Sequence, residues 1–243
     1  MGAAREQSEQ EAPSRVQVWA MFDRIAHRYD LLNRSLSFGQ DQRWRCRLAR
    51  YLPDRPDLRL VDLATGTADQ LLRLAKDPRI INGLGLDMAE KMLAIGREKI
   101  ERAGLSDKLK LDIGDATALP LPDACADVVT VAFGIRNVES VPKGLAEIRR
   151  ILKPAGRVLI LEFGLPRCAL IRCSYLWYFR HILPRIGGWI SGDAHAYRYL
   201  NRTVESFPYG ADFCALLEQA GFRAVRAHPL TFGVAFIYQG DRE

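Results

Sequence analysis

Three aspartates stand at the ends of three successive hydrophobic runs of the chain. Asp62 and Asp87 close the first two runs, and Asp115 closes the third. A helix N-cap would explain any one of them. It would not explain all three at the carboxyl ends of consecutive strands, the edge where open α/β sheets bind ligands. We therefore predict that the three carboxylates meet in one ligand-binding cleft.

The turn after the first run, DLATGTAD (62–69), limits the choice of ligand. A strand that leads through a glycine-containing turn into a helix is a common nucleotide-binding arrangement. Dinucleotide folds use G-x-G-x-x-G to bring the backbone close to a pyrophosphate, whereas this turn has only Gly66, followed by the hydroxyl of Thr67. S-adenosylmethionine carries no phosphate, and its sulfonium and amino acid end suit acids and backbone carbonyls. The turn therefore favours S-adenosylmethionine.

The remaining acids would then contact the adenosine half of this ligand. Asp87 would accept hydrogen bonds from both ribose hydroxyls in a bidentate manner. Met88 would pack on the base, and Asp115 would accept the exocyclic amine with Ala116 beside it. Together with Asp62, these residues make up the predicted cofactor site.

The segments that would position these residues alternate between strand and helix patterns. Four of the first five predicted strands are continuous hydrophobic runs, which is typical of a parallel sheet covered on both faces. Two closing strands, expected to be antiparallel, follow one more helix. The prediction is a doubly wound α/β fold with a seven-stranded, mostly parallel sheet. Predicted strands are 58–64, 83–87, 108–115, 126–133, 157–163, 222–229 and 231–239, and predicted helices are 68–76, 89–104, 141–154 and 209–222.

The chain is expected to form a single domain over residues 15–243. Residues 1–14 are polar, without the apolar core of a secretory signal, and are expected to be a disordered lead-in. Two amphipathic helices would form a head at 15–52. An aromatic-rich segment with interspersed arginines would form a helical substrate lid at 168–205. That segment would line a channel for a prenyl tail, lie on an anionic leaflet, or simply pack on the core.

The composition excludes several classes of protein. The 243 residues carry a net charge of +6, but the basic residues are dispersed, without the basic stripe of a nucleic-acid-binding face. No run is long and apolar enough to span a membrane. The five cysteines lack a C-x-x-C pair, so neither a disulfide framework nor a metal site is expected. We expect a cytoplasmic protein, with contact to the inner face of the membrane left open.

Five ordered motifs then resemble one family, the ubiquinone/menaquinone biosynthesis C-methyltransferases of the UbiE/MenG type. The resemblance implies a class I methyltransferase fold, S-adenosylmethionine as donor, and ring methylation of demethylmenaquinol or a polyprenyl methoxybenzoquinol. It places cofactor contacts at matching positions, Thr67, Asp87, Asp115 and Ala116, with Asp62 and Gly66 in the loop. The motifs are YDLLNRSLSFGQDQRW (29–44), DLATGTAD (62–69), GDATALPLPD (114–123), AFGIRNV (132–138) and RILKPAGRVLILEF (150–163).

The chain departs from the family pattern at three places. Ala68 replaces a glycine, which is tolerable if its φ is negative. Ala132 stands where relatives often have Ser, so this predicted cofactor-binding position has no hydroxyl to offer. Gln40-Asp41 replaces a His that commonly follows the S-F-G turn.

Ring methylation requires a carbon nucleophile, which a quinol becomes when its hydroxyl loses a proton. Arg136 cannot be the base, because its pKa stays above about 12, but it would stabilise the oxyanion or hold a water molecule. Asn137 would orient that oxygen, and Tyr29 would close over the cofactor. The structural alternatives are that Arg136 caps carbonyls or pairs with Glu139, and that Tyr29 packs between helices.

Two histidines and several partners complete the predictions. His181 and His195 are candidate bases, although a histidine in an aromatic stretch is more often structural. The expected partner is a prenylated quinol, with a homodimer or a quinone-biosynthesis complex left open. The alternatives are a methyltransferase for another small phenol or lipid, and a cofactor- or lipid-binding subunit without catalysis.

Overall fold

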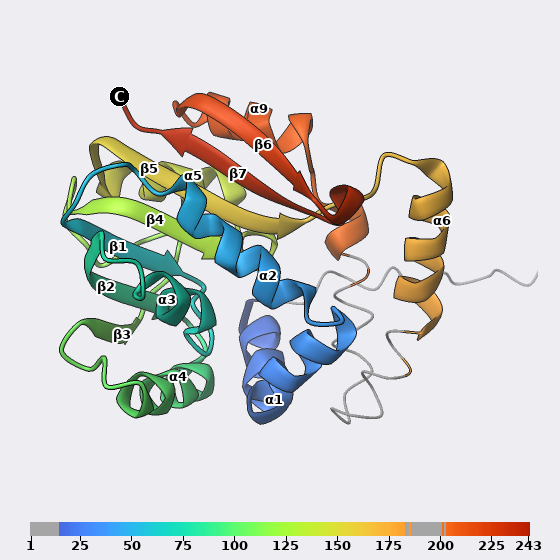
Figure 1. Cartoon of the computed structure of the whole chain (residues 1–243), viewed down its shortest axis with the longest axis horizontal. Coiled ribbons are helices and arrows are strands. Elements are labelled where there is room, and N and C mark those ends of the chain that lie inside the picture. The colour runs from blue at the N-terminus through green and yellow to red at the C-terminus, as the bar shows by residue number, and fades with distance from the viewer. Residues whose placement is uncertain (1–14, 183–184, 186–200, 202) are drawn as a thin grey trace, which may run out of the picture.

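Seven strands form one sheet in the order β3-β2-β1-β4-β5-β7-β6 (Figure 1). The structure is a computed structural model that describes residues 15–182, 185, 201 and 203–243. The predicted lead-in 1–14 and much of the predicted lid lie outside the described residues. The strands are β1 (Leu58–Leu63), β2 (Ile80–Asp87), β3 (Leu109–Ile113), β4 (Ala126–Ala132), β5 (Leu152–Phe163), β6 (Arg223–Leu230) and β7 (Ala235–Asp241).

The direction of each strand agrees with the predicted fold class. Strands β1 to β5 pair in parallel, and β7 lies antiparallel to both β5 and β6. Every residue of β4 is buried, as expected for a central strand covered on both faces. The prediction of a doubly wound, mostly parallel sheet with an antiparallel closing strand is confirmed.

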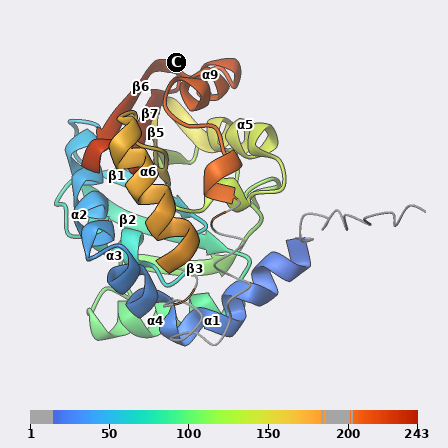
Figure 2. The same cartoon turned by 90° about the vertical axis from the view of Figure 1, so that its right-hand side faces the viewer.

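Helices cover the two faces of the sheet and enclose two hydrophobic cores (Figure 2). On one face lie α2 (Gln40–Arg47), a 3₁₀ turn (Leu48–Tyr51), α3 (Asp69–Leu74) and α4 (Glu90–Arg102). On the other face lie α5 (Val141–Ile151) and α9 (Ala211–Gln219). These helices leave the carboxyl edge of the sheet to other elements.

Two further helices lie beyond the carboxyl ends of the strands (Figure 1). They are α1 (Arg15–Leu36) and α6 (Ala169–Trp177), the latter continued by a π-helical turn (Tyr178–Ile182). A short 3₁₀ turn (Ile135–Asn137) follows β4, and another (Thr231–Gly233) precedes β7. Among the described residues, no helix combines the length and apolarity needed to cross a membrane.

Several predicted boundaries are wrong: β2 begins at Ile80 and not at 83, β7 begins at Ala235 and not at 231, and α5 ends early. The helix was expected to run to Pro154, but it ends at Ile151, and β5 begins at Leu152. Proline has no N–H to donate and disfavours a helical conformation in the residue before it. The chain therefore turns extended early, with a register shift between the pairs Ala126–Leu152 and Val128–Arg157.

Candidate functional site

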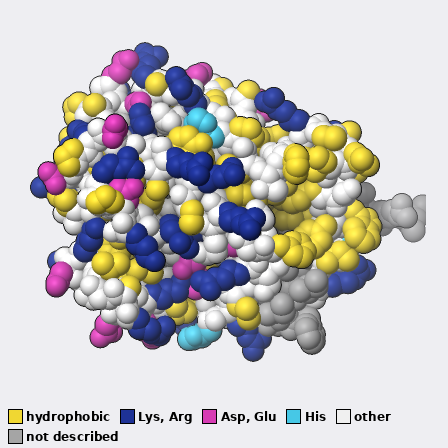
Figure 3. All heavy atoms as spheres, viewed as in Figure 1, with side chains coloured by type: hydrophobic (Ala, Val, Ile, Leu, Met, Phe, Trp, Pro, Cys, Tyr) yellow, Lys and Arg dark blue, Asp and Glu magenta, His cyan; other side chains and the backbone are white. Residues whose placement is uncertain are grey.

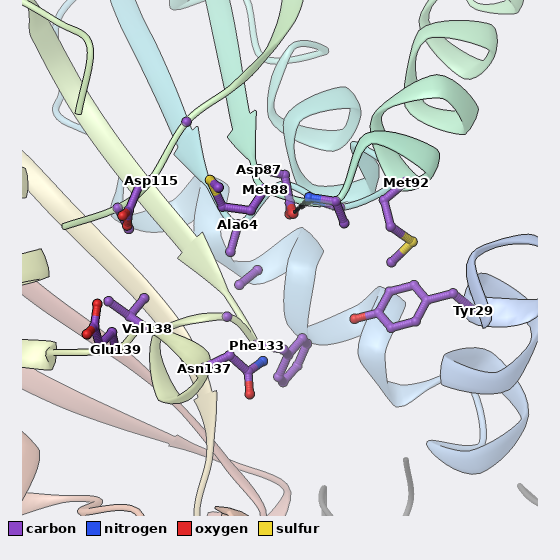
Figure 4. A pocket seen from close by; sticks show the side chains of 16 residues that line it. Tyr29, Ala64, Asp87, Met88, Met92, Asp115, Phe133, Asn137, Val138 and Glu139 are labelled. Carbon is purple, nitrogen blue, oxygen red and sulfur yellow. Dashed lines mark hydrogen bonds between the residues drawn. The ribbon is translucent and has the colours of Figure 1, made fainter. Parts of the chain in front are cut away.

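A pocket opens at the carboxyl edge of the sheet, over the ends of β1, β2 and β4 and the loop after β3 (Figure 4). Most of the predicted site residues line it, but Asp62, Thr67 and Arg136 do not. Tyr29 reaches in from α1, and its ring lies across the pocket from Phe133 and Asn137. The lining residues are Tyr29, Ala64, Gly66, Asp87, Met88, Ala89, Met92, Gly114, Asp115, Ala116, Ala132, Phe133, Gly134, Asn137, Val138 and Glu139.

Asp87 joins the two loops that form the floor of the pocket. One of its oxygens, Oδ2, accepts the Gly66 N–H at 2.8 Å, and Oδ1 accepts the Ala89 N–H at 2.9 Å. Burial raises the pKa of Asp87, and these N–H donors oppose the rise. A carboxylate has about four lone-pair sites, so Asp87 keeps acceptor capacity for a hydroxyl group of a ligand in the pocket.

Asp62 supports the site from beneath. Its two oxygens accept the hydroxyls of Thr65 at 2.7 Å and Thr130 at 2.5 Å, and it is 1% exposed. Burial raises the pKa of Asp62 to about 6. The expectation that Asp62 lines the cleft with the other acids is wrong, because its oxygens are used to hold the turn after β1.

Thr67 takes part in a network that fastens α1 to the sheet. Its hydroxyl donates to Asp30 at 2.6 Å and accepts from Lys99 Nζ at 2.9 Å. Lys99 also contacts the carboxylates of Asp30 and Asp69, each at 2.5 Å. These bonds tie the head helix to α4 and to the loop after β1. A direct cofactor contact by Thr67 stays a prediction.

The loops around the pocket adopt an unusual backbone conformation. Positive φ values occur at Ala64 (49°), Gly66 (55°), Ala68 (63°) and Phe133 (61°). The condition under which alanine would be tolerable at position 68, a negative φ, is not met. A left-handed conformation costs an L-residue about 1–2 kcal/mol, and such strain gathers at ligand sites where the surroundings enforce it.

Asp115 and its neighbours form the end of the pocket next to β3. Asp115 Oδ1 accepts both the N–H and the hydroxyl of Thr117, at 2.9 and 2.8 Å. These local bonds fix the direction of the carboxylate. Met88 and Ala116 contribute apolar surface to the same pocket. The set suits a flat base with an exocyclic amine, as the predicted roles require.

Arg136 lies behind the pocket wall in a buried ion pair. Its Nη1 donates to Glu162 Oε1 at 2.7 Å and to the Phe133 carbonyl at 2.8 Å. The two side chains are 6% and 1% exposed. Arg136 therefore caps a carbonyl, as one alternative proposed, but its carboxylate partner is Glu162 and not Glu139. Sequence reasoning missed Glu162, although an acid at the carboxyl end of a buried strand was the available signal.

The ion pair leaves several buried polar atoms without partners. Arg136 Nε, Glu162 Oε2 and the Tyr175 hydroxyl have no hydrogen-bond partner among the described residues. Burial raises the pKa of Glu162, opposed by the charge of Arg136. Burial also raises the pKa of Tyr175, on which Arg136 and Glu162 act with opposite signs. Tyr175 of α6 thus lies within electrostatic reach of the pair, which links the described part of the predicted lid to Arg136.

Tyr29 lines the pocket and packs between α1 and α4, while closure over the cofactor stays a prediction. Its ring points into the pocket (Figure 4). Burial raises the pKa of Tyr29, and a hydrogen bond with the Asn33 side chain opposes this. The tyrosine is thus held by its own helix and still faces the space beside Asn137.

The two candidate histidines gain no support as bases. His181 is exposed, does not line the pocket, and lies beside the Trp177 ring at 6.2 Å between centroids. His195 lies outside the described residues. In the part of the chain that the structure describes, no three His, Cys, Asp or Glu side chains form a group that could hold a metal ion.

The residues of the pocket fit S-adenosylmethionine. Asp87 offers acceptor sites for ribose hydroxyls, Asp115 offers one for the adenine amine, and Met88 offers an apolar face for the base. With the doubly wound sheet, these features define a class I methyltransferase that uses S-adenosylmethionine. The fold resembles a solved S-adenosylmethionine-dependent methyltransferase from Thermotoga maritima, with a TM-score of 0.64 and 19% identity over 93% of this chain and 100% of that one.

The sequence comparisons define the family. Residues 7–242 match the model of the ubiE/COQ5 methyltransferase family, and the chain belongs to it. It is 47% identical to a demethylmenaquinone methyltransferase from Thermus thermophilus, over 91% of this chain and 100% of that protein. It is 43% identical to the ubiquinone/menaquinone biosynthesis C-methyltransferase UbiE of Geobacter sulfurreducens, over 91% and 87% of the two chains. The predicted family is confirmed.

Proposed function

We propose that this chain transfers a methyl group from S-adenosylmethionine to a ring carbon of a prenylated quinol, such as demethylmenaquinol. The observation that carries the proposal is the 47% identity, over the whole length of the relative, with a protein named for that reaction. The pocket supports it, because Tyr29, Phe133 and Asn137 face one another beside the donor residues.

The residues of the proposed S-adenosylmethionine site serve to position the methyl donor. When bound, S-adenosylmethionine supplies an electrophilic methyl group on a good leaving group. The protein must therefore hold donor and acceptor in line, which can contribute about 7–11 kcal/mol to catalysis. Asp87 and the backbone of Gly66, joined at 2.8 Å, are fixed relative to each other before a ligand arrives. That preorganisation lowers the entropy cost of alignment.

The acceptor must lose a hydroxyl proton before its ring carbon can attack. Asn137 and Tyr29 would hold the oxygen from two sides of the pocket. Arg136 binds the Phe133 carbonyl at 2.8 Å, so it fixes the turn that carries Asn137. Its charge, placed behind that turn, would favour the deprotonated oxygen, although Glu162 neutralises part of it.

Methyl transfer from labelled S-adenosylmethionine to reduced demethylmenaquinone tests the proposal. We expect label in a product heavier by one methyl group, and a fall in turnover for Asn137→Ala with donor affinity retained. A polyprenyl methoxybenzoquinol and a short-tailed quinol in parallel assays give the acceptor class. Donor binding without transfer to any quinol would contradict the proposal and favour a non-catalytic binding subunit.

We also propose that the side of the molecule bearing α6 contacts the inner face of the membrane. Figure 3 shows hydrophobic side chains gathered there beside basic ones. Leu170 and Trp177 of α6 are 77% and 60% exposed, and Phe38, 77% exposed, contacts the Tyr178 ring at 5.8 Å. Exposed apolar groups next to arginines suit an anionic leaflet.

Vesicle flotation tests this contact. Leu170→Gln with Trp177→Gln should reduce binding to anionic vesicles, while Ile113→Gln, a control at an exposed residue in β3, should not. Equal flotation of both variants would contradict membrane contact. A change in sedimentation of the double variant would instead assign the surface to a second copy of the chain or to a partner in quinone biosynthesis.

A further inference from the structure

Arg45 is a buried cation that forms no direct ion pair with any described residue, although its charge acts on Asp62 and Asp69. It lies in α2, is 6% exposed, and its Nε has no hydrogen-bond partner. Among the residues that the structure describes, no ion pair or hydrogen bond reaches its guanidinium, whose Cζ lies over the Phe133 ring, 5.2 Å from the centroid. The guanidinium of Arg136, by contrast, has Glu162 at 2.7 Å.

Such an arrangement is costly unless a ligand completes it. Arginine remains protonated at all relevant pH values. An unpaired charge removed from water costs several kcal/mol, even after the protein relaxes. A cation that stays buried in this way is best explained by an anion that binds to it in the working enzyme.

The position of Arg45 narrows the choice of anion. The ring on which it stacks, Phe133, lines the pocket. Burial raises the pKa values of Tyr29 and Asp62, and the charge of Arg45 opposes the rise in both. Arg45 thus lies near the ends of β1 and β4.

The donor would lie along the sheet edge in a fixed order. Asp115 follows β3 and Asp87 ends β2, which are neighbours at one side of the order β3-β2-β1-β4. Adenosine held by these two acids leaves the amino acid end over β1 and β4, where Arg45 lies. That end carries the only carboxylate of S-adenosylmethionine.

We propose that Arg45 binds the α-carboxylate of S-adenosylmethionine. The planar guanidinium can engage a carboxylate through two parallel hydrogen bonds, which fixes orientation as well as position. With Asp87 at the ribose, this contact would hold the donor at both ends and so aim the methyl group at the acceptor. The inference rests on the proposed donor site but not on the quinol.

Calorimetry with two ligands tests this contact. S-adenosylhomocysteine has the amino acid end, whereas methylthioadenosine shares the adenosine and lacks it. For Arg45→Met we expect S-adenosylhomocysteine affinity to fall about 10- to 100-fold, the range for a lost charge-assisted hydrogen bond, and methylthioadenosine affinity to stay unchanged. Arg47→Met is the matched control, since Arg47 is an exposed arginine of the same helix, and both affinities should match those of the unaltered chain.

Thermal unfolding without ligand separates binding from folding. Removal of an unpaired buried charge should leave the melting temperature of Arg45→Met unchanged or raise it. If that variant does not fold, Arg45→Lys provides the test. It should fold, lose part of its affinity for S-adenosylhomocysteine and keep its affinity for methylthioadenosine, because lysine keeps the charge but cannot form two parallel hydrogen bonds.

Two outcomes would overturn the inference. Equal losses for both ligands would make Arg45 a support of the pocket shape only. Unchanged affinity for both would assign its charge to another anion, such as the acceptor oxygen. Failure of the proposed function looks different: the unaltered chain would bind S-adenosylhomocysteine with the expected Arg45 dependence and still methylate no quinol.

Discussion

Around one part of the pocket the buried acids Asp62 and Asp87 are engaged by nearby donors, whereas around Arg45, Arg136 and Glu162 several buried polar atoms have no partner among the described residues. Asp62 accepts two threonine hydroxyls and Asp87 accepts two backbone N–H groups. By contrast, Arg45 Nε, Arg136 Nε and Glu162 Oε2 lack hydrogen-bond partners in the part of the chain that the structure describes. The difference indicates that the part of the proposed donor site around Asp87, here called the donor half, is engaged before binding, whereas ligands would complete the surroundings of Arg45, Arg136 and Glu162.

The two groups of residues also differ in which elements of the chain contribute them. Asp87 bonds to backbone within its own strand end and the adjacent loop. Arg136 and Glu162 meet across β4 and β5, and Tyr175 reaches them from α6. Unsatisfied buried polar groups are uncommon in folded proteins, so the occurrence of three of them in Arg136, Glu162 and Tyr175, which act on one another electrostatically, points to function.

The largest effect is expected from breaking the buried pair. Arg136→Met leaves the Glu162 carboxylate buried without a countercharge, which should lower the free energy of unfolding by about 3–5 kcal/mol. Urea denaturation measures it. Arg97→Met is the control, because its pair with Glu90 is 44% and 53% exposed, and it should cost less than about 1 kcal/mol. Similar losses in the free energy of unfolding for the two variants would show that Arg136 does not compensate the buried charge of Glu162.

A second test concerns the acid beneath the donor loop. The folded pKa of Asp62, about 6, lies above its ordinary value of 3.8. Protonation therefore favours the folded state: this stabilisation is complete below about pH 4 and is lost as the pH rises through about 6. The loss amounts to about 3 kcal/mol for about two pKa units.

Asp62→Asn removes that titration. The stability of the variant relative to the unaltered chain should therefore rise between about pH 4 and pH 7, by up to about 3 kcal/mol. Urea denaturation of both proteins across this range measures the difference. If the free energies of unfolding of the two proteins changed with pH in parallel, the Asp62 carboxylate would not be shielded from water as its 1% exposure implies.

The third effect tests the donor half directly. Asp87→Ala should weaken S-adenosylhomocysteine binding by about 1–3 kcal/mol, through lost charge-assisted hydrogen bonds and a loosened Gly66 backbone. Calorimetry measures it, with Asp112→Ala, an exposed acid of β3, as control. Unchanged affinity would remove Asp87 from the donor site.

The donor half could be predicted from the sequence because strand ends are visible in the pattern of residues. Asp87 and Asp115 follow hydrophobic runs, and parallel strands bring their carboxyl ends to one edge. The same reasoning placed Asp62 in the cleft and failed, because the pattern does not reveal that Thr65 and Thr130 occupy its oxygens.

The burial of Arg45 and the pairing of Arg136 with Glu162 could not be predicted in the same way. Arg45 stands in the polar segment QDQRWRCR (40–47), where the sequence gives no reason to single out one arginine as buried. Glu162 pairs with Arg136 across 26 positions of the chain. These contacts depend on how distant elements of the chain pack together. The local hydrophobic pattern of the sequence does not show that packing.

The smallest effect concerns backbone strain in the loop between β1 and α3, which contains Ala68. Ala68 and Ala75 are both buried, at 0% and 4% exposure, and both flank α3. Their backbones differ, since φ is 63° at Ala68 and −59° at Ala75. Substitution by glycine removes a buried methyl group and adds chain entropy to the unfolded state in both cases.

Only Ala68→Gly also relieves a left-handed conformation, which costs an L-residue about 1–2 kcal/mol. Ala68→Gly should therefore destabilise the protein by about 1 kcal/mol less than Ala75→Gly does, as measured by urea denaturation. Equal losses would mean that the loop holds no strain at Ala68. If the smaller loss came with weaker S-adenosylhomocysteine binding, the strained loop would be part of the preformed donor half, because the added freedom would have to be removed again when the ligand binds.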